Sequence, residues 1–415
     1  MKIIIVGAGL AGTASALALT KWMPSKPEIT VVELRTKPLT MGGAIGLTPN
    51  ALRALHALGV MEGIKERRLG ADIDRIELFD VYSAARLGNI NFCDAYGNGV
   101  GKPSFKGLRI LRSDLLVALL ATTKQHSNIK IRYGRTVNSI TEDDDAVVIG
   151  FAEDQVQLTA DLLIGADGIH SMVRKLHVEP DRAPKYTGIA AIGGFAVVSP
   201  DHPLQWEDTA LSQSLRGSLL CSHYERTRTR QFIAAVMETE DVRSKEGWIA
   251  MGKEQEEIKR RVKERYLGAN IKMHGIPPLI ESSRDWNLYP VYALPPQGKW
   301  STGRVILVGD AAHAMPPQGE SAGIAFEDAV ILGRTMCTTD DKGLTGRLAV
   351  YERLRRPRTD EAYRQASFGW NTLKDSGWLA FQIRSWVTWA FLWWTAKSRA
   401  LHYGEDLATK ELDFS

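Results

Sequence analysis

The chain has 415 residues, 44% of them hydrophobic and 24% charged, which is the composition of an ordinary globular protein with room for roughly two or three domains. Its 52 basic and 48 acidic residues give a net charge of +4, a balance that argues against nucleic-acid binding. The three cysteines are far apart and form no CxxC pair, so we expect neither a disulfide framework nor a metal site, and we expect a reducing, cytoplasmic compartment.

The N-terminal segment predicts a strand, a helix and a second strand. Ile and Val at residues 2–6 form a buried strand, residues 13–21 continue as a helix rich in Ala and Leu, and residues 29–32 form another strand. The apolar run at 3–19 also resembles the core of a signal peptide, whose cleavage would remove the first strand. The glycine spacing between strand and helix favours the folded alternative.

The turn between this strand and helix reads Gly-Ala-Gly-Leu-Ala-Gly, the G-x-G-x-x-G pattern of dinucleotide-binding proteins. Gly7 permits a tight turn, Gly9 lets the backbone approach a pyrophosphate, and Gly12 lets the helix pack on the strand. Glu33, at the end of the second strand, can accept a ribose hydroxyl. The sequence therefore predicts an adenine-dinucleotide site, with a glycine-rich packing turn as the alternative.

Two features of the next segment also suggest a ligand. Three glycines in residues 42–50, including Gly46, indicate close approach to a ligand, with a flexible loop as the alternative. A helix expected at 112–120 begins with Arg112, where a cation opposes the helix dipole. A bound phosphate or flavin explains that position better than helix stability does, although a surface arginine is the alternative. Other elements are expected here: a helix at 50–58 and strands at 73–80 and 90–93. Residues 104–110 should return the chain to the first domain.

The middle of the chain changes from mixed to β structure. We expect residues 129–132 and 146–151 to form hairpin strands, and residues 161–165 to form a strand leading to Asp167-Gly168. A helix should start at 169–173, with Ser171 and Arg174 near its opening. Strands of a second domain are then expected at 189–198, 218–224 and 231–237, followed by helices at 253–265 and 344–365.

The stretch at 304–328 combines two binding features. A short buried strand ends in Gly309, which allows a tight turn, and in Asp310, whose carboxylate lies where open α/β sheets bind ligands. Pro316 stiffens the loop that follows. Gly319 and Gly323 open a helix whose free N–H groups suit an anion. A flavin needs both features, an acceptor for its hydroxyls and N–H donors for its reduced, anionic ring. The alternative gives Asp310 the role of a helix cap.

In this order the motifs resemble those of the group A flavoprotein monooxygenases, the p-hydroxybenzoate and salicylate hydroxylase-like family. Residues 7–12 with Glu33 resemble the family's ADP-binding fingerprint, Asp167-Gly168 its DG motif, and residues 309–313 its GD motif. Arg112 matches the arginine that heads its FAD-contacting helix. The resemblance covers roughly residues 1–365, and Trp286, Asp328 and the Arg-Arg-Pro-Arg run at 355–358 also fit. The family's Gly-Gln-Gly after the proline loop is replaced by Gly-Glu-Ser-Ala-Gly.

The resemblance implies an α/β fold in which an FAD-binding Rossmann-like domain joins a β-sheet substrate domain and a helical C-terminus. The FAD-binding domain would combine residues 1–70, 101–180 and 276–365, and the substrate domain residues 71–100 and 181–275. Residues 366–415 would form a Trp-rich helical segment. The expected FAD-binding residues are Gly7, Gly9, Gly12, Glu33, Gly46, Arg112, Asp167, Asp310, Gly319 and Gly323.

The implied activity is that of an FAD monooxygenase with NADPH or NADH as co-substrate. A flavin C4a-hydroperoxide would deliver one oxygen atom of O₂ to a small aromatic or lipophilic substrate, with Pro316 beside the reacting edge of the flavin. His223 and Tyr224 are candidates to activate a phenol. Neighbouring strand residues face opposite ways, so at most one of them should point at the substrate, and two ordinary strand residues are the alternative. Hydroxylation, epoxidation and Baeyer–Villiger insertion share these motifs.

Two other functions fit the same motifs. The first is another flavin oxidoreductase of this fold, such as a reductase or a halogenase. A halogenase should carry Trp-x-Trp-x-Ile-Pro, and the Trp-Val-Thr-Trp run at 386–389 has the wrong spacing. The second is a binding protein in which FAD is structural.

Residues 367–403 contain six of the eleven tryptophans. The run at 378–396 is about long enough to span a bilayer, but Gln382 and Arg384 fall inside it, and tryptophan prefers the membrane interface. A helix pair packed on the FAD-binding domain and an amphipathic helix on a membrane are the remaining alternatives. We expect the segment to pack on the body of the protein and to leave an aromatic patch suited to peripheral membrane or partner contact.

Overall fold

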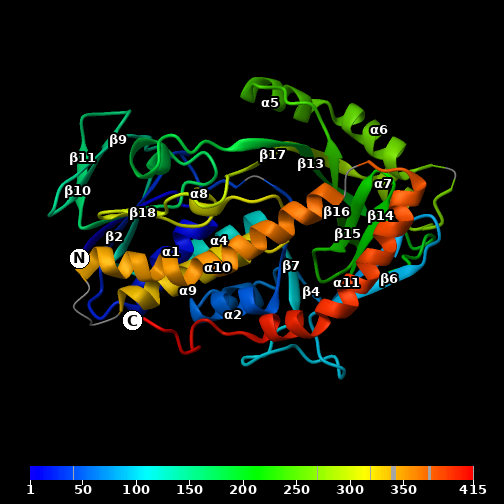
Figure 1. Ribbon diagram of the computed structural model, residues 1–415, viewed down its shortest axis with the longest axis horizontal. Coiled ribbons are helices and arrows are strands. Elements are labelled where there is room, and N and C mark those ends of the chain that lie inside the picture. Colours follow the sequence, from blue (N-terminus) through cyan, green and yellow to red (C-terminus); the bar gives the residue numbers. More distant parts are fainter. Residues whose placement is uncertain (41, 269, 318, 338–342, 373–374, 415) are drawn as a thin grey trace.

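The computed structural model describes residues 1–40, 42–268, 270–317, 319–337, 343–372 and 375–414. Two large sheets lie at opposite ends of the molecule (Figure 1). The long helix α10 (Gly343–Thr372) runs from one end toward the other, and α11 (Trp378–Gly404) lies beside the second sheet. Both chain termini lie at the end that holds the first sheet.

The first sheet is six-stranded and, except for its edge strand β18, parallel. Its central strands are buried runs of Ile, Val and Leu, as expected for a parallel sheet covered on both faces. In spatial order the strands are β18 (Ser301–Thr302), β19 (Val305–Leu307), β12 (Leu162–Gly165), β1 (Lys2–Val6), β2 (Glu28–Glu33) and β8 (Ile129–Tyr133).

Helices cover this sheet. Helix α1 (Leu10–Trp22) is buried along most of its length because it packs against both α4 (Arg112–Thr123) and α9 (Ser321–Met336). Close approach of α9 depends on Gly333, where a Cβ would lie 2.9 Å from the carbonyl oxygen of Ala18. The shorter helices on this side are α2 (Pro49–Ala57), α3 (Met61–Glu66), α8 (Asp310–His313) and the π-helical turn η1 (Arg174–Val178).

Two small sheets flank the parallel one. A surface sheet contains β9 (Val137–Glu142), β10 (Val147–Phe151) and β11 (Gln157–Ala160). The other places β7 (Gly107–Leu111) between β3 (Ala44–Leu47) and β4 (Ala71–Ile73).

The second large sheet has seven strands, antiparallel except for the pair β14–β5. In spatial order they are β17 (Arg284–Ala293), β13 (Lys185–Val197), β16 (Arg230–Glu238), β15 (Gly217–His223), β14 (Thr209–Ser214), β5 (Arg75–Asp80) and β6 (Arg86–Asn91). The helices α5 (Lys245–Lys253), α6 (Gln255–Tyr266) and α7 (Ile276–Ser282) accompany it.

The seven-stranded sheet has two apolar faces. Leu219 and Cys221 of β15 belong to the core cluster that includes residues of α5, α6 and α7. The alternate residues face the other way, where Leu220, Tyr224 and Phe232 cluster with residues of β3 and β7. The second face of this sheet therefore meets the part of the chain that carries the glycine-rich segment at 42–47.

Helix α11 lies along β6 and reaches α2 (Figure 1). Only four residues of this 27-residue helix are buried, among them Phe381 and Tyr403. For the described part of residues 367–403, the expectation that they pack on the body and expose an aromatic patch is confirmed. The first part of α11 covers the seven-stranded sheet rather than the FAD side. Over the described residues, no helix combines the length and apolar composition needed to cross a membrane.

Most expected elements are present, and the expected pairing of two strands is wrong. Residues 129–132 do not pair with residues 146–151: β8 is an edge strand beside β2, whereas β10 lies in the surface sheet. Strand β17 pairs with β13, so residues 284–293 complete the second sheet, although the expected partition gives them to the FAD-binding domain. The helix expected to start within 169–173 begins at Met172 and continues as the π-helical turn η1. Strand β14 was not expected at all. The rest of the domain partition stays a prediction.

Candidate active site

The glycine turn after β1 has the local geometry that the sequence predicts. Gly7 has φ +105°, and a Cβ there would lie 2.5 Å from the carbonyl oxygen of Ala166. At Gly12 a Cβ would lie 1.9 Å from the carbonyl oxygen of Gly7, so the helix can approach the turn only without a side chain. Gly9 has no neighbour within 4 Å of such a Cβ among the described residues. The turn is tight on two sides and open at Gly9.

Glu33 closes the turn from β2. Its Oε2 accepts a hydrogen bond from the backbone N–H of Ala8 at 2.9 Å, and its Oε1 accepts one from the N–H of Arg35 at 3.0 Å. The side chain is mostly buried. The carboxylate therefore lies at the carboxyl end of β2, against the glycine turn.

Asp310 lies at the carboxyl end of β19 and is exposed. The preceding Gly309 has φ +59°, and a Cβ there would lie 3.1 Å from the Cβ of Ala11. Gly309 is the N-cap of α8, and the Asp310 side chain makes no capping hydrogen bond, so the alternative that made Asp310 a helix cap is wrong. Among the described residues nothing bonds to this carboxylate, which leaves it free to accept hydrogen bonds from a ligand.

A buried charge network holds the turn before Asp310. Asp328 is fully buried. It accepts hydrogen bonds from the N–H of Gly309 at 3.0 Å and from Nε of Arg355 at 2.7 Å. Its Oδ2 also lies 2.7 Å from Nε2 of His313. Arg355 also bonds to Glu327 at 3.1 Å. Burial alone would raise the pKa of Asp328, but His313 and Arg355 lower it to about 2. Asp328 therefore fixes the turn as a permanent anion.

The segment before α9 is held by a second ion pair. Glu320 pairs with Arg358, and His402 of α11 lies 3.7 Å from the Glu320 carboxylate. Burial would raise the pKa of Glu320, but His402 and Arg358 lower it. Gly319 has φ +87° and open space around it, whereas a Cβ at Gly323 would lie 2.9 Å from the Cβ of Ala51. The missing side chain of Gly323 thus lets α9 pack on α2, and this packing accounts for the glycine without a ligand.

The DG and GD segments are tied together by an arginine. Arg174 is buried and donates to the carbonyl oxygens of Ala311 at 2.7 Å and Ile169 at 2.5 Å. Oδ2 of Asp167 accepts the N–H of Met172 at 2.6 Å, while its buried Oδ1 has no partner among the described residues. Burial raises the pKa of Asp167. The sequence indicated Arg174 near the DG helix but did not reveal its contact with residue 311.

Arg112 heads α4 as expected and is half-buried. Its Nε donates to Oγ1 of Thr40 at 3.0 Å, and its backbone N–H donates to the carbonyl oxygen of Gly43 at 3.1 Å. Pro316 is buried in the loop between α8 and α9.

His223 and Tyr224 face opposite sides, as strand alternation predicts. Nδ1 of His223 lies 3.3 Å from the carbonyl oxygen of Arg230, and its Nε2 lies 3.2 Å from Nε2 of Gln231. Burial lowers the pKa of His223. Tyr224 clusters with Ala44 and Phe232. Tyr224 therefore lies between the seven-stranded sheet and β3, and His223 lies on the opposite face of that sheet.

Gly46 and Arg109 form a contact that the sequence did not reveal. A Cβ at Gly46 would lie 3.1 Å from Nη1 of Arg109, so the close approach expected at this glycine is made by a guanidinium of the same chain. Nε of Arg109 donates to Oγ of Ser222 on β15 at 3.1 Å. Arg109 interrupts the otherwise apolar run Leu-Arg-Ile-Leu of β7, but the sequence does not show that its guanidinium is buried.

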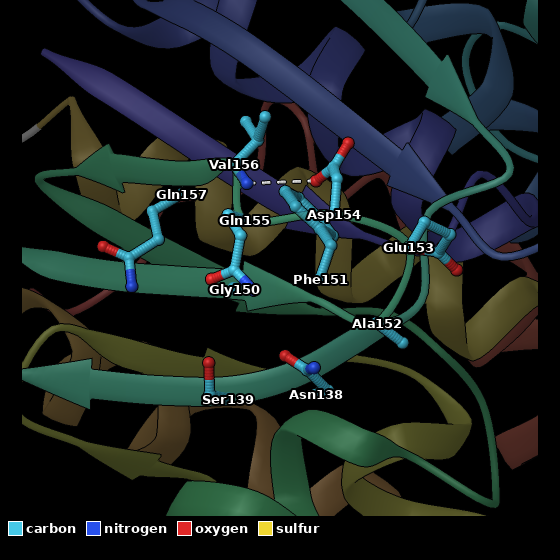
Figure 2. Close-up of a pocket in the computed structure, with 10 residues that line it drawn as sticks. All are labelled: Asn138, Ser139, Gly150, Phe151, Ala152, Glu153, Asp154, Gln155, Val156 and Gln157. Carbon is cyan, nitrogen blue, oxygen red and sulfur yellow. Dashed lines mark hydrogen bonds between the residues drawn. The ribbon is translucent and has the colours of Figure 1, made fainter.

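A surface pocket of about 340 Å³ lies elsewhere, on the sheet of β9, β10 and β11 (Figure 2). Asp154 accepts the N–H of Val156 at 3.1 Å, as Figure 2 shows. Asp154 also pairs with Arg135, and Glu153 accepts the N–H of Thr136, so both acids of the loop are already engaged. Its lining includes none of the motif residues, so we assign it no role in the active site.

Comparison with known proteins identifies the family. The model of the FAD-binding domain family matches residues 1–366. The chain belongs to this family. The 3-amino-4-hydroxybenzoate 2-monooxygenase of Streptomyces cremeus is 30% identical over 377 residues, covering 88% of this chain and 86% of the relative. The 3-hydroxybenzoate 6-hydroxylase of Klebsiella oxytoca is 28% identical over 364 residues, covering 86% and 85%.

Solved structures share the fold. The Klebsiella pneumoniae HpxO complex with FAD and uric acid aligns with a TM-score of 0.78 at 20% identity, covering 97% of this chain and 96% of that one. A salicylate hydroxylase substrate complex aligns with a TM-score of 0.75 at 21% identity, covering 99% and 98%. The protein is therefore an FAD-dependent monooxygenase with NAD(P)H as co-substrate, and the resemblance inferred from its motifs is confirmed.

The residues present fit FAD. Gly9 is open where a pyrophosphate would approach, Asp310 presents a free acceptor, and Oδ1 of Asp167 is buried without a partner among the described residues. All three belong to turns that follow strands of the parallel sheet, which is where such folds bind dinucleotides.

Proposed function

We propose that this monooxygenase hydroxylates a small aromatic substrate bound between strands β3 and β7 and the seven-stranded sheet. The observation that carries the proposal is the apolar cluster that joins Ala44 and Leu111 on one side to Phe195, Tyr224 and Phe232 on the other. Aromatic side chains in edge and tilted contact suit a planar ring. The hydroxylase names of the relatives support the same reaction.

FAD would be held by the turns described above. Gly7, Gly9 and Gly12 would admit its pyrophosphate, Glu33 would accept hydroxyls of the adenosine ribose, and Asp310 would accept a hydroxyl of the flavin side. Arg112, Asp167 and Gly46 would line the cofactor, while N–H groups of the segment at 319–323 would face the anionic ring. The bound flavin supplies the oxygen-transfer chemistry, and the residues of this chain supply binding, orientation and exclusion of water.

Tyr224 would position the substrate. Burial raises the pKa of Tyr224, so its phenol keeps its proton at neutral pH and can donate a hydrogen bond to an oxygen of the ring substrate. Pro316 would border the reacting edge of the flavin in a loop that Asp328 and Glu320 fix from behind. Phe195 and Phe232 would hold the ring against Tyr224 and restrict the access of water.

Purified protein tests this function directly. It should be yellow, release intact FAD on denaturation, and oxidise NADPH or NADH faster when a hydroxylatable aromatic compound is present. The product should gain one oxygen atom by mass. Failure of the protein to bind flavin on reconstitution would contradict the proposal. NAD(P)H oxidation that no substrate accelerates, with stable FAD, would instead favour a structural flavin, and a reduced or halogenated product would favour the rival oxidoreductases.

We also propose peripheral contact between α11 and an anionic membrane surface. Its exposed apolar residues recur at helical spacing on one face: Leu379, Ile383, Trp386, Trp393, Trp394 and Leu401. The exposed Lys397 lies on the same face, and α11 contains no Asp or Glu. Tryptophan with basic residues on an amphipathic helix suits a lipid interface, and the lack of acids favours anionic lipid.

Flotation with phosphatidylserine-containing vesicles tests this contact. Removing the whole segment would be a poor test, because Arg53 donates to the carbonyl oxygens of Tyr403 and Glu405, which anchor the end of α11. The double variant Trp393→Ser/Trp394→Ser leaves that anchor intact and should no longer float. Equal behaviour of both proteins, or association of the unchanged protein with itself instead of vesicles in size-exclusion chromatography, would contradict the proposal.

A further inference from the structure

Arg109 lies where strand β7 faces the seven-stranded sheet. Leu108 and Ile110, its neighbours on the strand, point into the core on the FAD side. Arg109 points the other way, together with Leu111, whose side chain packs in the cluster around Tyr224. The guanidinium therefore lies in the same layer as the aromatic residues assigned above to the substrate.

The charge of this arginine has no counter-ion. Its side chain is only 6% exposed, and burial alone lowers the pKa of Arg109 to about 10 with no carboxylate nearby to raise it. At neutral pH it is still a cation. Nε donates to Ser222, and neither terminal nitrogen has a hydrogen-bond partner among the described residues. A buried charge without a partner is costly, so such a site is stabilised by an anion that arrives with a ligand.

The neighbours of Arg109 fix its orientation. Gly46 leaves space for the guanidinium, because a Cβ there would lie between 3.1 and 3.4 Å from Nη1, Cζ and Nη2. Oγ of Ser222 lies 2.6 Å from Oγ1 of Thr209 and donates to the carbonyl oxygen of His223 at 3.2 Å. Ser222 is thereby oriented to accept from Nε of Arg109. Holding a guanidinium through Nε leaves both terminal nitrogens available to another group.

We propose that Arg109 binds a negatively charged oxygen group of the substrate, a carboxylate or a phenolate, and so selects anionic aromatic compounds. This inference rests on the proposed function and deepens it. The planar fork of an arginine matches a carboxylate with two parallel hydrogen bonds, which a lysine cannot do. Tyr224, in the same layer, would then contact a different edge of the ring.

The test compares each acid with its amide. FAD-loaded protein is titrated with 3-hydroxybenzoate, salicylate and 3-amino-4-hydroxybenzoate and with the matching benzamides, and binding is followed through the flavin absorption spectrum. In the unchanged protein at least one acid should bind more tightly than its amide. Arg109→Met should weaken binding of that acid by roughly 10- to 100-fold and leave the amide within about threefold. Arg109→Lys should recover part of the loss.

Arg53→Met is the matched control, because Arg53 is equally buried but donates to backbone carbonyl oxygens. It should lower thermal stability while keeping the preference for the acid. 4-Nitrophenol separates the two anions: its visible phenolate band should grow on binding to the unchanged protein, and not to Arg109→Met, if the group bound is a phenolate. A carboxylate site predicts the acid preference without that band.

Three results would overturn the proposal. The first is that no acid binds more tightly than its amide and the phenolate band does not grow. The second is that Arg109→Met weakens the binding of acid and amide equally. The third is that this variant loses FAD but keeps its preference for the acid, which would assign the arginine to the flavin. Failure of the proposed function gives a different result, because the protein would then bind acids through Arg109 without forming a hydroxylated product.

Discussion

Two buried arginines show how differently the two sides of the molecule treat charge. Arg355 on α10 faces both Asp328 and Glu327. Burial would lower the pKa of Arg355, but the two carboxylates raise it above its usual value. Arg109, at the face of the seven-stranded sheet, is as well buried and has no carboxylate beside it. A fully paired buried charge belongs to the scaffold, whereas an unpaired one indicates a place for a ligand.

The same contrast separates the carboxylates on the FAD side. Asp328 is enclosed and accepts several donors, while Asp310 is exposed and free. In the sequence, α8, the loop to α9 and the first half of α9 separate them. The scaffold residue holds the backbone turn, and the free residue extends from it toward the carboxyl end of the sheet. The comparison predicts that changes at paired charges alter stability first and changes at free charges alter ligand binding first.

The largest effect should come from Asp328→Asn. The amide would lose the charge that faces Arg355 and would meet the N–H of Gly309 with a weaker acceptor, leaving a buried cation partly unpaired. We expect the free energy of unfolding to fall by about 3–5 kcal/mol. Urea denaturation measures it. Arg353→Met, which removes an exposed pair with Asp413, should cost less than about 1 kcal/mol. Similar losses of unfolding free energy in the two variants would contradict the distinction between buried and exposed charge pairs.

The pH dependence sharpens the same point. The pKa of Asp328 is about 2 in the folded protein and about 3.9 in an unfolded chain, so its stabilising charge is fully present above pH 4. The unfolded state takes up the proton first, and the contribution is lost as pH falls from about 4 to about 2. The stability difference between the unchanged protein and Asp328→Asn should shrink over that range in denaturation curves recorded at each pH. A constant difference would contradict the assignment.

Asp310→Ala and Arg174→Ala should separate ligand binding from stability. Asp310→Ala removes a free acceptor, so FAD affinity should fall by roughly 10- to 100-fold with little loss of stability. Arg174→Ala leaves the carbonyl oxygens of Ala311 and Ile169 without their donor, so unfolding should become easier while FAD affinity falls less. Fluorescence titration with FAD and thermal unfolding measure the two effects. Equal, small losses of FAD affinity in the two variants would contradict the expectation that Asp310 contributes more to FAD binding than Arg174 does.

Glu33→Ala should have a smaller effect on the cofactor. Its carboxylate already accepts N–H groups of Ala8 and Arg35, so it combines a scaffold role with the proposed ribose contact. We expect FAD affinity to fall roughly tenfold or more. Glu33→Gln keeps the acceptor oxygen without the charge and should lose less. If FAD affinity is unchanged in both variants, Glu33 has only the scaffold role.

Much of the FAD side could be predicted because its signals are local. A Cβ at Gly12 would meet the carbonyl oxygen of Gly7 in the same turn, and strand, turn and helix follow one another directly. The packing of Gly323 on Ala51 could not be predicted, because the two residues are remote in sequence. The pairing of β8 with β2 was missed for the same reason, since two short apolar runs do not reveal their partners.

The substrate side was less predictable. Alternation along β15 established that His223 and Tyr224 face opposite ways, but the sequence could not reveal which of them faces β3. Arg109 stands out only after the structure shows it buried, because an arginine in a strand is usually solvated at its tip. The absence of a counter-ion is a property of three strands together, β7, β3 and β15, and no single stretch of the sequence contains it.

The smallest effect on stability should come from the exposed face of α11. Trp393 and Trp394 are 73% and 80% exposed, whereas Phe381 on the same helix is fully buried beside Tyr82. Trp393→Ser and Trp394→Ser should each change the free energy of unfolding by no more than about 0.5 kcal/mol, while Phe381→Ala should cost about 3–5 kcal/mol.

The tryptophan variants should nevertheless lose vesicle binding, which Lys397→Glu should also reduce by reversing charge on that face. A large loss of stability in the tryptophan variants would mean that this face is covered by part of the protein. Unchanged stability with unchanged flotation would leave these tryptophans without the membrane role assigned to them.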